Sequence, residues 1–174
     1  GGDLTGSYPA PAIADRAVTA SKTGPRPYGQ LTMSADQNFP SSTVGPHIAF
    51  DHVARDVGGV AVSPTNNQLI APIAGVYAVS ASICWASNAT GYRILALQTI
   101  HTTSGGTSYD YFGASDVGAN PTSATCQTAS TLLPLEAGDR VTTYPYQTSG
   151  SALLVYADGI GQSTFTMAWI APSS

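Results

Sequence analysis

The sequence predicts an all-β fold, an antiparallel β-sandwich of about ten strands. Short runs in which apolar and polar residues alternate follow one another from residue 29 to the end of the chain, and this alternation is typical of half-buried strands. Turn-forming residues separate the runs, and the chain has 18 glycines and 12 prolines. No segment shows the helical period of about 3.6 residues. The combination favours a jelly roll.

The clearest predicted strand is GVYAVSASICW, residues 75–85. Its odd-numbered positions from Tyr77 to Trp85 are mostly large, whereas even-numbered positions such as Ser80 and Ser82 are small. Large and small side chains therefore fall on opposite faces of the strand. Three runs precede it and six follow it, at residues 29–34, 46–51, 67–72, 92–102, 107–113, 124–135, 140–149, 152–157 and 163–171.

The segment LPLEAGDRV, residues 133–141, joins two of these strands by a tight turn. Gly138 can adopt a positive φ, and the side chain of Asp139 can accept hydrogen bonds from nearby backbone amides. We expect the charged residues to lie on a solvated corner while Leu135 and Val141 point inward. The motif is therefore interpreted as structural rather than catalytic.

Charged residues make up only 9% of the chain, and the net charge is −4. The six basic residues are scattered, whereas nucleic-acid binding needs clustered lysine and arginine. No apolar run approaches the roughly 18 residues of a membrane helix. We expect neither a nucleic-acid nor a membrane partner. The chain begins Gly1-Gly2, as expected of a processed chain or a fragment.

The sequence shows no catalytic or metal-binding pattern. The single glutamate, Glu136, belongs to the turn, and the aspartates are scattered over loops, so paired-carboxylate catalysis is not expected. On a flat strand His47 and Asp51 would share one face and His52 would take the other, so the three could not converge on a metal. We expect no enzymatic activity, no metal and no cofactor.

Residues 101–123 are the best candidate for a ligand-recognition surface. Tyr109 and Tyr111 offer aromatic faces beside the acceptors Asp110 and Asp116, a combination suited to sugars. In the alternative interpretation, the aromatic side chains simply cover the sandwich.

Residues 1–28 differ from the rest of the chain. They contain four prolines and four glycines without sustained alternation, which predicts an extended arm or, alternatively, a disordered linker. The candidates for attaching this arm to a larger particle are its apolar residues Leu4, Tyr8, Ile13 and Val18.

Three segments resemble the tumour necrosis factor (TNF) and complement C1q superfamily. LPLEAGDRV resembles its strand–turn–strand hallmark, IAPIAGVYAVSASICW its P-x-x-G-x-Y strand, and STFTMAWI its closing strand, although Met167 stands where a glycine is usual. The resemblance covers residues 70–170. It implies a TNF-like jelly roll whose first and last strands are neighbours. It also implies a homotrimer, with one sheet of each subunit facing the threefold axis.

This resemblance also implies where the trimer interface lies. It places the closing strand beside the 75–85 strand, so that bulky Phe165 and Trp169 would fill the axis next to small residues. In the alternative, the large residues of the closing strand lie in the subunit's own core and Ile170 points outward. The expected interface residues are Ala78, Ser80, Ser82, Thr128, Phe165, Met167 and Trp169.

The same resemblance places the strand that carries Cys126 beside the strand that carries Cys84, with both sulfurs on one face. The two cysteines could then form a disulfide. Two buried free thiols are the alternative.

A second resemblance covers residues 1–22. GGDLTGSYPAPAIADRAVTASK is similar to segments that recur in bacteriophage tail-fibre and related virion proteins. It implies a phage virion protein with an attachment arm at residues 1–28 and a jelly-roll knob at residues 29–174, assembled in the host cytoplasm and displayed on the virion surface. The expected partners are other virion proteins and a bacterial surface glycan or protein. In the alternative, the protein decorates a capsid or tail and stabilises the particle.

Overall fold

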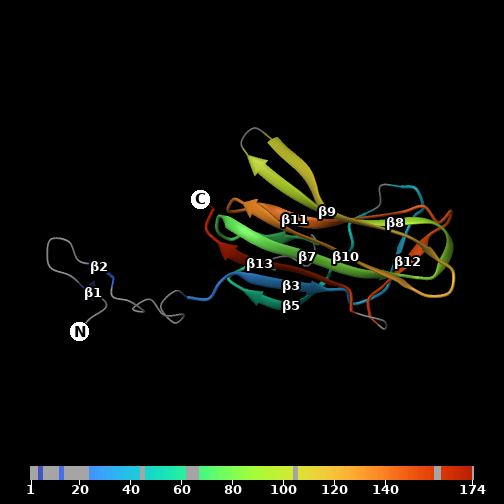
Figure 1. The fold of residues 1–174 in the computed structure, drawn as a ribbon, viewed down its shortest axis with the longest axis horizontal. Helices are drawn as coiled ribbons and strands as arrows, with labels where there is room; N and C mark the ends of the chain where they lie inside the picture. The colour runs from blue at the N-terminus through green and yellow to red at the C-terminus, as the bar shows by residue number, and fades with distance from the viewer. Residues whose placement is uncertain are drawn as a thin grey trace.

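The protein is a sandwich of two antiparallel β-sheets (Figure 1). The computed structural model describes residues 4–5, 12–13, 24–43, 46–61, 67–103, 106–158 and 162–173. All elements within these residues are strands, which confirms the predicted all-β class. The described residues include no helix that is long and apolar enough to cross a membrane.

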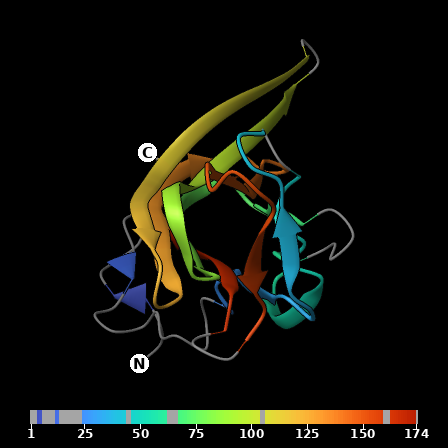
Figure 2. The ribbon, with the colours of Figure 1, turned by 90° about the vertical axis from the view of Figure 1, so that its right-hand side faces the viewer.

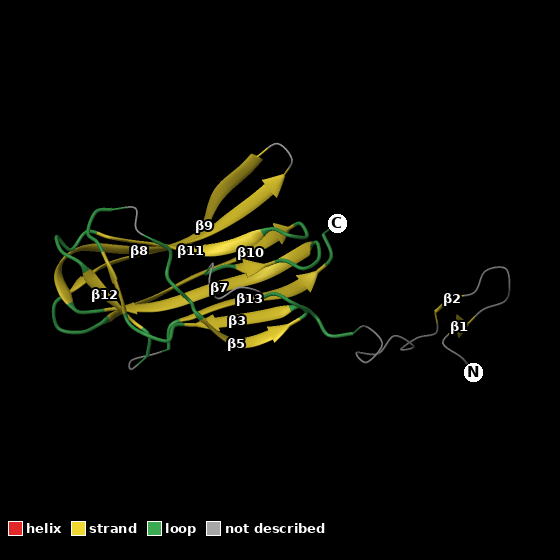
Figure 3. Ribbon diagram, turned by 180° about the vertical axis from the view of Figure 1, so that it is seen from behind, coloured by secondary structure: helices red, strands yellow, loops and turns green. Residues whose placement is uncertain are grey.

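The first sheet is centred on β7 (Gly75–Trp85), whose bounds match the clearest predicted strand. Along its length β7 pairs with β10 on one side and with β13 on the other, so that Ser80 lies opposite both Ser130 and Thr166. Figure 3 shows these strands side by side with β3 and β5. The strands around β7 are β3 (Tyr28–Thr32), β4 (Gln37–Phe39), β5 (His52–Val57), β10 (Thr125–Leu135), β12 (Leu153–Tyr156) and β13 (Thr164–Ala171).

The second sheet has the strand order β6, β11, β8, β9. Its two longest strands form a hairpin whose far end extends beyond the sandwich (Figure 2), where residues 106–112 are all exposed. The prediction ended the second strand of this hairpin at residue 113, but the strand continues to Asn120. The bounds are β6 (Leu69–Ile70), β8 (Asn88–Thr103), β9 (Gly106–Asn120) and β11 (Arg140–Gln147).

The edges of the two sheets lie close together beside a bulge in β9. The pairing with β8 jumps from Leu95–Ser115 to Leu97–Phe112, which leaves Gly113 beside the irregularity with a φ of 58°. A Cβ atom on Gly113 would lie 2.9 Å from the carbonyl oxygen of Ser130 in β10. Glycine is needed here both for the left-handed backbone and for this close approach.

The core lies between the sheets and contains the inward face predicted for β7. Tyr77 and Trp85 are fully buried, and the Trp85 ring packs edge-on against Phe39 with centroids 5.8 Å apart. Leu135 and Val141, on either side of the Gly-Asp turn, are also buried as expected. Each large apolar side chain contributes roughly 1.5–3 kcal/mol by leaving water.

The structure differs from the predicted strand pattern between residues 37 and 57, where the short strand β4 was also not predicted. Residues 46–51 form no strand: the N–H of Phe50 donates to the carbonyl of Ile48 at 3.0 Å, and the side-chain amide of Gln37 bonds both the N–H and the carbonyl of Ala49, at 2.8 Å each. The alternation predicted at Ile48 and Phe50 instead reflects two buried side chains. Strand β5 was not predicted because it is exposed on both faces and so has no apolar period.

The first and last strands of the sandwich are neighbours, as the TNF and C1q resemblance implied. Tyr28 at the start of β3 lies opposite Ala168 near the end of β13, at the end of the sandwich where the C-terminus lies (Figure 1). Within residues 1–28, β1 (Leu4–Thr5) pairs with β2 (Ala12–Ile13), an antiparallel pair that the expected extended arm did not include. Tyr8 and Val18 lie outside the described residues.

Candidate functional site

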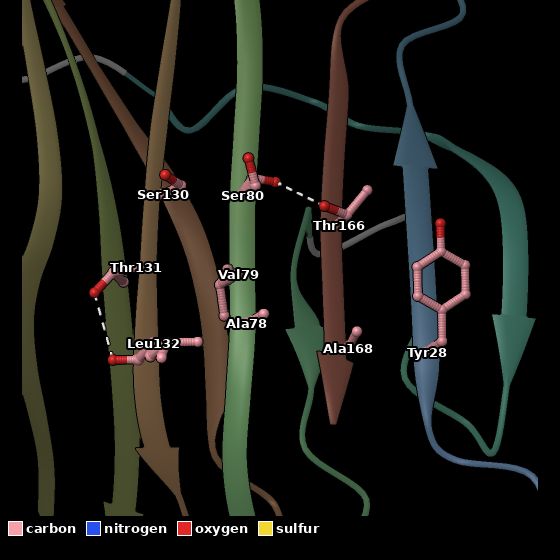
Figure 4. Close-up of a pocket in the computed structure, with 9 residues that line it drawn as sticks. All are labelled: Tyr28, Ala78, Val79, Ser80, Ser130, Thr131, Leu132, Thr166 and Ala168. Carbon is pink, nitrogen blue, oxygen red and sulfur yellow. Dashed lines mark hydrogen bonds between the residues drawn. The ribbon is translucent and has the colours of Figure 1, made fainter. Parts of the chain in front are cut away.

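The outward face of the first sheet carries a hollow of about 400 Å³ (Figure 4). It crosses four adjacent strands, β10, β7, β13 and β3. None of its lining side chains is charged. The lining residues are Tyr28, Ala78, Val79, Ser80, Ser130, Thr131, Leu132, Thr166 and Ala168.

Small side chains in register produce this hollow. Ala78 lies opposite Ala168 across the β7–β13 pair, so neither strand carries a bulky group there. On the other side of β7, Leu132 lies opposite Ala78 and is 63% exposed, which leaves a leucine standing at the edge of the hollow. The expected interface residues Ser82 and Thr128 share the same outward face and are joined by a hydrogen bond of 3.0 Å between their hydroxyls.

The closing strand β13 faces the other way from the expected interface. Phe165 lies opposite Ala81 and Met167 opposite Val79, both inward positions of β7, and both side chains are fully buried in the core. The expectation that Phe165 and Met167 face a threefold axis is therefore wrong. Trp169 also packs against the core, and its indole N–H donates to the carbonyl of Ala74 at 3.4 Å. The structure instead agrees with the alternative interpretation, in which the large residues of this strand lie in the subunit's own core and Ile170, which is 47% exposed, points outward.

Cys84 and Cys126 form a disulfide that joins β7 to β10. Both residues project from the outward face, because they alternate with buried Ile83 and Gln127. The structure thus decides between the disulfide and the two free thiols. The bond lies on the same sheet face as the hollow.

A second surface of interest lies on the outward face of the second sheet. Tyr111 of β9 and Tyr144 of β11 meet edge to face over β8, with ring centroids 5.0 Å apart and planes at 77°. Ala96 of β8 lies opposite Tyr144, and its small side chain leaves room for this contact. Tyr92 and Tyr146 form a second ring pair, with centroids 6.0 Å apart.

The predicted ligand residues are only partly brought together on this surface. Tyr111 and Asp116 belong to it, since they lie opposite Gln98 and Ile94 on the outward side of β8. Tyr109 continues the same side into the projecting end of the hairpin, whereas Asp110 alternates to the opposite side. The prediction missed Tyr92, Tyr144 and Tyr146, because cross-strand register brings them to Tyr111 and Asp116 from other strands.

The tyrosine hydroxyls on this surface influence one another. Burial raises the pKa of Tyr144, and the nearby hydroxyls of Tyr111 and Tyr146 add to the shift. Partial desolvation raises the pKa of Tyr92, with further contributions from Tyr146 and Asp116. The raised pKa favours the neutral hydroxyl form of Tyr92 and Tyr144, and a neutral hydroxyl both donates and accepts hydrogen bonds.

The histidines of the described chain have separate partners. The Nδ1 atom of His47 lies 2.8 Å from the carbonyl oxygen of Thr143, and that of His52 lies 3.2 Å from the hydroxyl of Thr32. Among the residues that the structure describes, no group of three histidine, cysteine or carboxylate side chains could hold a metal ion.

The fold is similar to that of several solved structures. The globular domain of zebrafish complement 1qA protein aligns with a TM-score of 0.57 and 12% identity, over 85% of this chain and 100% of that chain. Eiger TNF from S. frugiperda aligns with a TM-score of 0.59 and 14% identity, over 85% and 93% of the two chains. Murine APRIL at pH 8.0 aligns with a TM-score of 0.64 and 9% identity, over 84% and 100%.

These alignments show that the chain has a jelly-roll fold of the TNF and C1q type, and at such low identity they show the fold alone. No family model and no curated protein sequence matches the chain.

Proposed function

We propose that this protein is a non-enzymatic bacteriophage virion protein, a homotrimeric knob that recognises the host surface. The proposed trimer is supported by the uncharged hollow on the outward face of the first sheet, with Leu132 exposed at its edge. The phage assignment is supported by the resemblance of residues 1–22 to tail-fibre segments.

The outward face of the first sheet suits contact with copies of the same chain. Small residues such as Ala78 and Ala168 let a neighbouring subunit approach closely, and an exposed leucine supplies apolar area to bury. Because no lining side chain is charged, association would not require removing an ion from water. The implied trimer uses this same sheet.

Light scattering coupled to size exclusion tests the assembly. The chain should elute with about three times its mass of 17.8 kDa. Leu132→Arg should lower the mass to that of a single subunit without loss of β circular dichroism, because a charge would then have to be buried between subunits. Ile73→Arg is the matched control, since Ile73 is 46% exposed but does not line the hollow. A single-subunit mass for the unaltered chain at micromolar concentration would contradict the trimer.

Removing the gene tests whether the knob serves adhesion or decoration. If the knob recognises the host, particles without it should assemble with normal heat resistance but adsorb poorly to cells. If such particles instead adsorb normally and lose heat resistance, the protein is a decoration protein. The virion-surface location is checked by labelling intact particles with an antibody to the chain.

A further inference from the structure

We propose that the outward face of the second sheet is a carbohydrate-binding site formed by Tyr92, Tyr111, Tyr144 and Tyr146 together with Asp116. We call these five residues the tyrosine surface. The proposal builds on the proposed host recognition and specifies its ligand as a short, uncharged oligosaccharide.

The aromatic rings of the tyrosine surface are held in place yet open to solvent. Tyr111 is 56% exposed and Tyr92 is 41% exposed, although each is in contact with a second tyrosine ring. Between them, Ala96 and Gln98 point outward from β8 but are only 4% and 6% exposed. Neighbouring side chains therefore cover Ala96 and Gln98, so that the outward face of the sheet is a continuous surface here.

The geometry of the rings suits the C–H-bearing face of a sugar. The planes of Tyr111 and Tyr144 are inclined by 77°, so together they form a corner rather than a flat platform. A pyranose packed into such a corner would contact the face of one ring and the edge of the other. Tyrosine provides this contact at little entropic cost, because its side chain has few rotatable bonds.

Polar groups beside the rings suit the hydroxyls of a sugar. The ring of Tyr92 lies 6.0 Å from that of Tyr146, and both Tyr146 and Asp116 contribute to the raised pKa of Tyr92, after the larger effect of partial desolvation. Phenolic hydroxyls donate and accept hydrogen bonds, whereas an ionised carboxylate only accepts them. Asp116 is exposed, so its acceptor oxygens are available to a ligand. This mixture of donors and acceptors around an aromatic centre matches an uncharged polyol.

The size of the surface favours a small ligand over a protein. It spans β11, β8 and β9, two interstrand spacings or about 10 Å, and the six residue steps from Tyr92 to Gln98 of β8, or about 20 Å. The footprint is then on the order of 200 Å², well below the roughly 800 Å² that each partner contributes to a standard protein–protein interface. An oligosaccharide of a few sugars fits these dimensions.

The tyrosine surface is on the outward face of the second sheet and the hollow is on the outward face of the first, so the two lie on opposite sides of the sandwich. In a trimer assembled through the first sheet, three such surfaces would face away from the axis. Weak single-site binding of a repeating surface polysaccharide would then be strengthened by multivalency.

The test is binding of the full chain to an array of uncharged and anionic oligosaccharides two to six sugars long, followed by titration of the strongest member. We expect an uncharged oligosaccharide to bind and Tyr111→Ala to weaken its binding about tenfold, the loss of roughly 1.4 kcal/mol of aromatic contact. Tyr109→Ala is the matched control. Tyr109 has nearly the same exposure, 57%, but lies outside the tyrosine surface, so this variant should bind like the unaltered chain.

A second variant guards against loss of structure. Tyr144→Phe keeps the ring and removes only the hydroxyl, so it should fold normally and bind the oligosaccharide less tightly. The proposal is overturned if no oligosaccharide binds, or if Tyr109→Ala and Tyr111→Ala weaken binding equally. The proposal is likewise overturned if no member of the array binds while the chain binds host envelope and protease treatment of the envelope abolishes that binding. This result would indicate a protein partner.

Failure of this proposal and failure of the proposed assembly are distinguishable. Leu132→Arg should lower the mass but leave single-site affinity for the oligosaccharide unchanged, because Leu132 lies on the other sheet. Tyr111→Ala should leave the mass unchanged.

Discussion

The imidazole Nδ1 of His101 lies 2.7 Å from the carboxylate Oδ2 of Asp139 and links the end of β8 to the turn before β11. The same carboxylate oxygen accepts a hydrogen bond of 2.8 Å from the backbone N–H of Glu136. Asp139 is only 6% exposed, so the expectation that all the charges of this turn stay on a solvated corner is wrong for Asp139. Its carboxylate organises the turn from a largely buried position.

Asp139→Ala should therefore destabilise the protein by about 2 kcal/mol, because it leaves the Glu136 amide and the His101 ring without their acceptor. Leu135→Ala should cost more, roughly 2–5 kcal/mol, as for a buried leucine. Glu136→Ala is the control: its side chain is exposed, and the change should stay within about 0.5 kcal/mol. Urea unfolding measures all three. Equal stability of the Asp139 and Glu136 variants would contradict the role of this contact.

Asp51 gives the protein a predictable response to acid. A hydrogen bond from the Ser34 hydroxyl lowers the pKa of Asp51, and the Ser34 backbone N–H at 2.8 Å adds to this effect. A lowered pKa in the folded state means that the stabilisation is present above the ordinary value near 4 and is lost as the pH falls through the folded-state value. Thermal melts between pH 2 and pH 6 should show a shallower acid dependence for Asp51→Asn, and an unchanged slope would contradict this prediction.

The Cys84–Cys126 disulfide closes a loop with a sequence separation of 42 residues. Its removal in the double variant Cys84→Ala, Cys126→Ala should lower the free energy of unfolding by about 2–4 kcal/mol, chiefly because the unfolded chain gains conformational entropy. Adding a reductant should lower the melting temperature of the unaltered chain towards that of the double variant. If the reductant changes neither protein, while mass spectrometry shows that the thiols of the unaltered chain have been freed, the bond contributes nothing to stability.

Substitution of Phe165 distinguishes a position in the subunit core from the expected position in the trimer interface. The ring is fully buried and packs against Phe50 with centroids 5.6 Å apart. Phe165→Ala should lower the free energy of unfolding by roughly 3–5 kcal/mol through loss of apolar burial and creation of a cavity. The protein that remains folded should keep the mass of the unaltered chain in light scattering. Dissociation into stable single subunits would instead restore the interface role first expected for this residue.

The sequence predicted the fold more completely than the sites. Period-two alternation gave β7 and β13 nearly residue by residue, because one face of each strand is buried and the other is not. It failed at residues 46–51, where the side-chain amide of Gln37, rather than a neighbouring strand, bonds the backbone of Ala49. It also did not identify the buried Arg93, which takes an inward position next in alternation to Leu95.

The candidate sites depend on register between strands that are distant in sequence. Ala78 and Ala168 were both recognisable as small, but only their pairing makes the floor of a hollow. Tyr111 was recognisable as an exposed aromatic, whereas its contact with Tyr144 requires three strands to be placed side by side. Local alternation carries no information about such pairings.

The last prediction concerns residues 1–28 and the point at which they meet the sandwich. The carbonyl of Pro27 accepts a hydrogen bond of 2.9 Å from the backbone N–H of Trp169, and Arg26 lies 5.6 Å from the centre of the Trp169 ring. Tyr28 lines the hollow. These residues belong to the sandwich, so the boundary that separates arm from knob should lie before Arg26 rather than after Tyr28.

A chain that begins at Gly24 should therefore fold and assemble like the full chain, whereas a chain that begins at Gly29 should be less stable because it loses the contacts to Trp169. If residues 1–23 attach the knob to the virion, the chain that begins at Gly24 should be missing from particles after complementation of a gene deletion. Mass spectrometry of purified particles measures its incorporation, with the full chain as the control. Normal incorporation of the shortened chain would mean that the sandwich itself attaches to the particle and that the preceding residues are a linker.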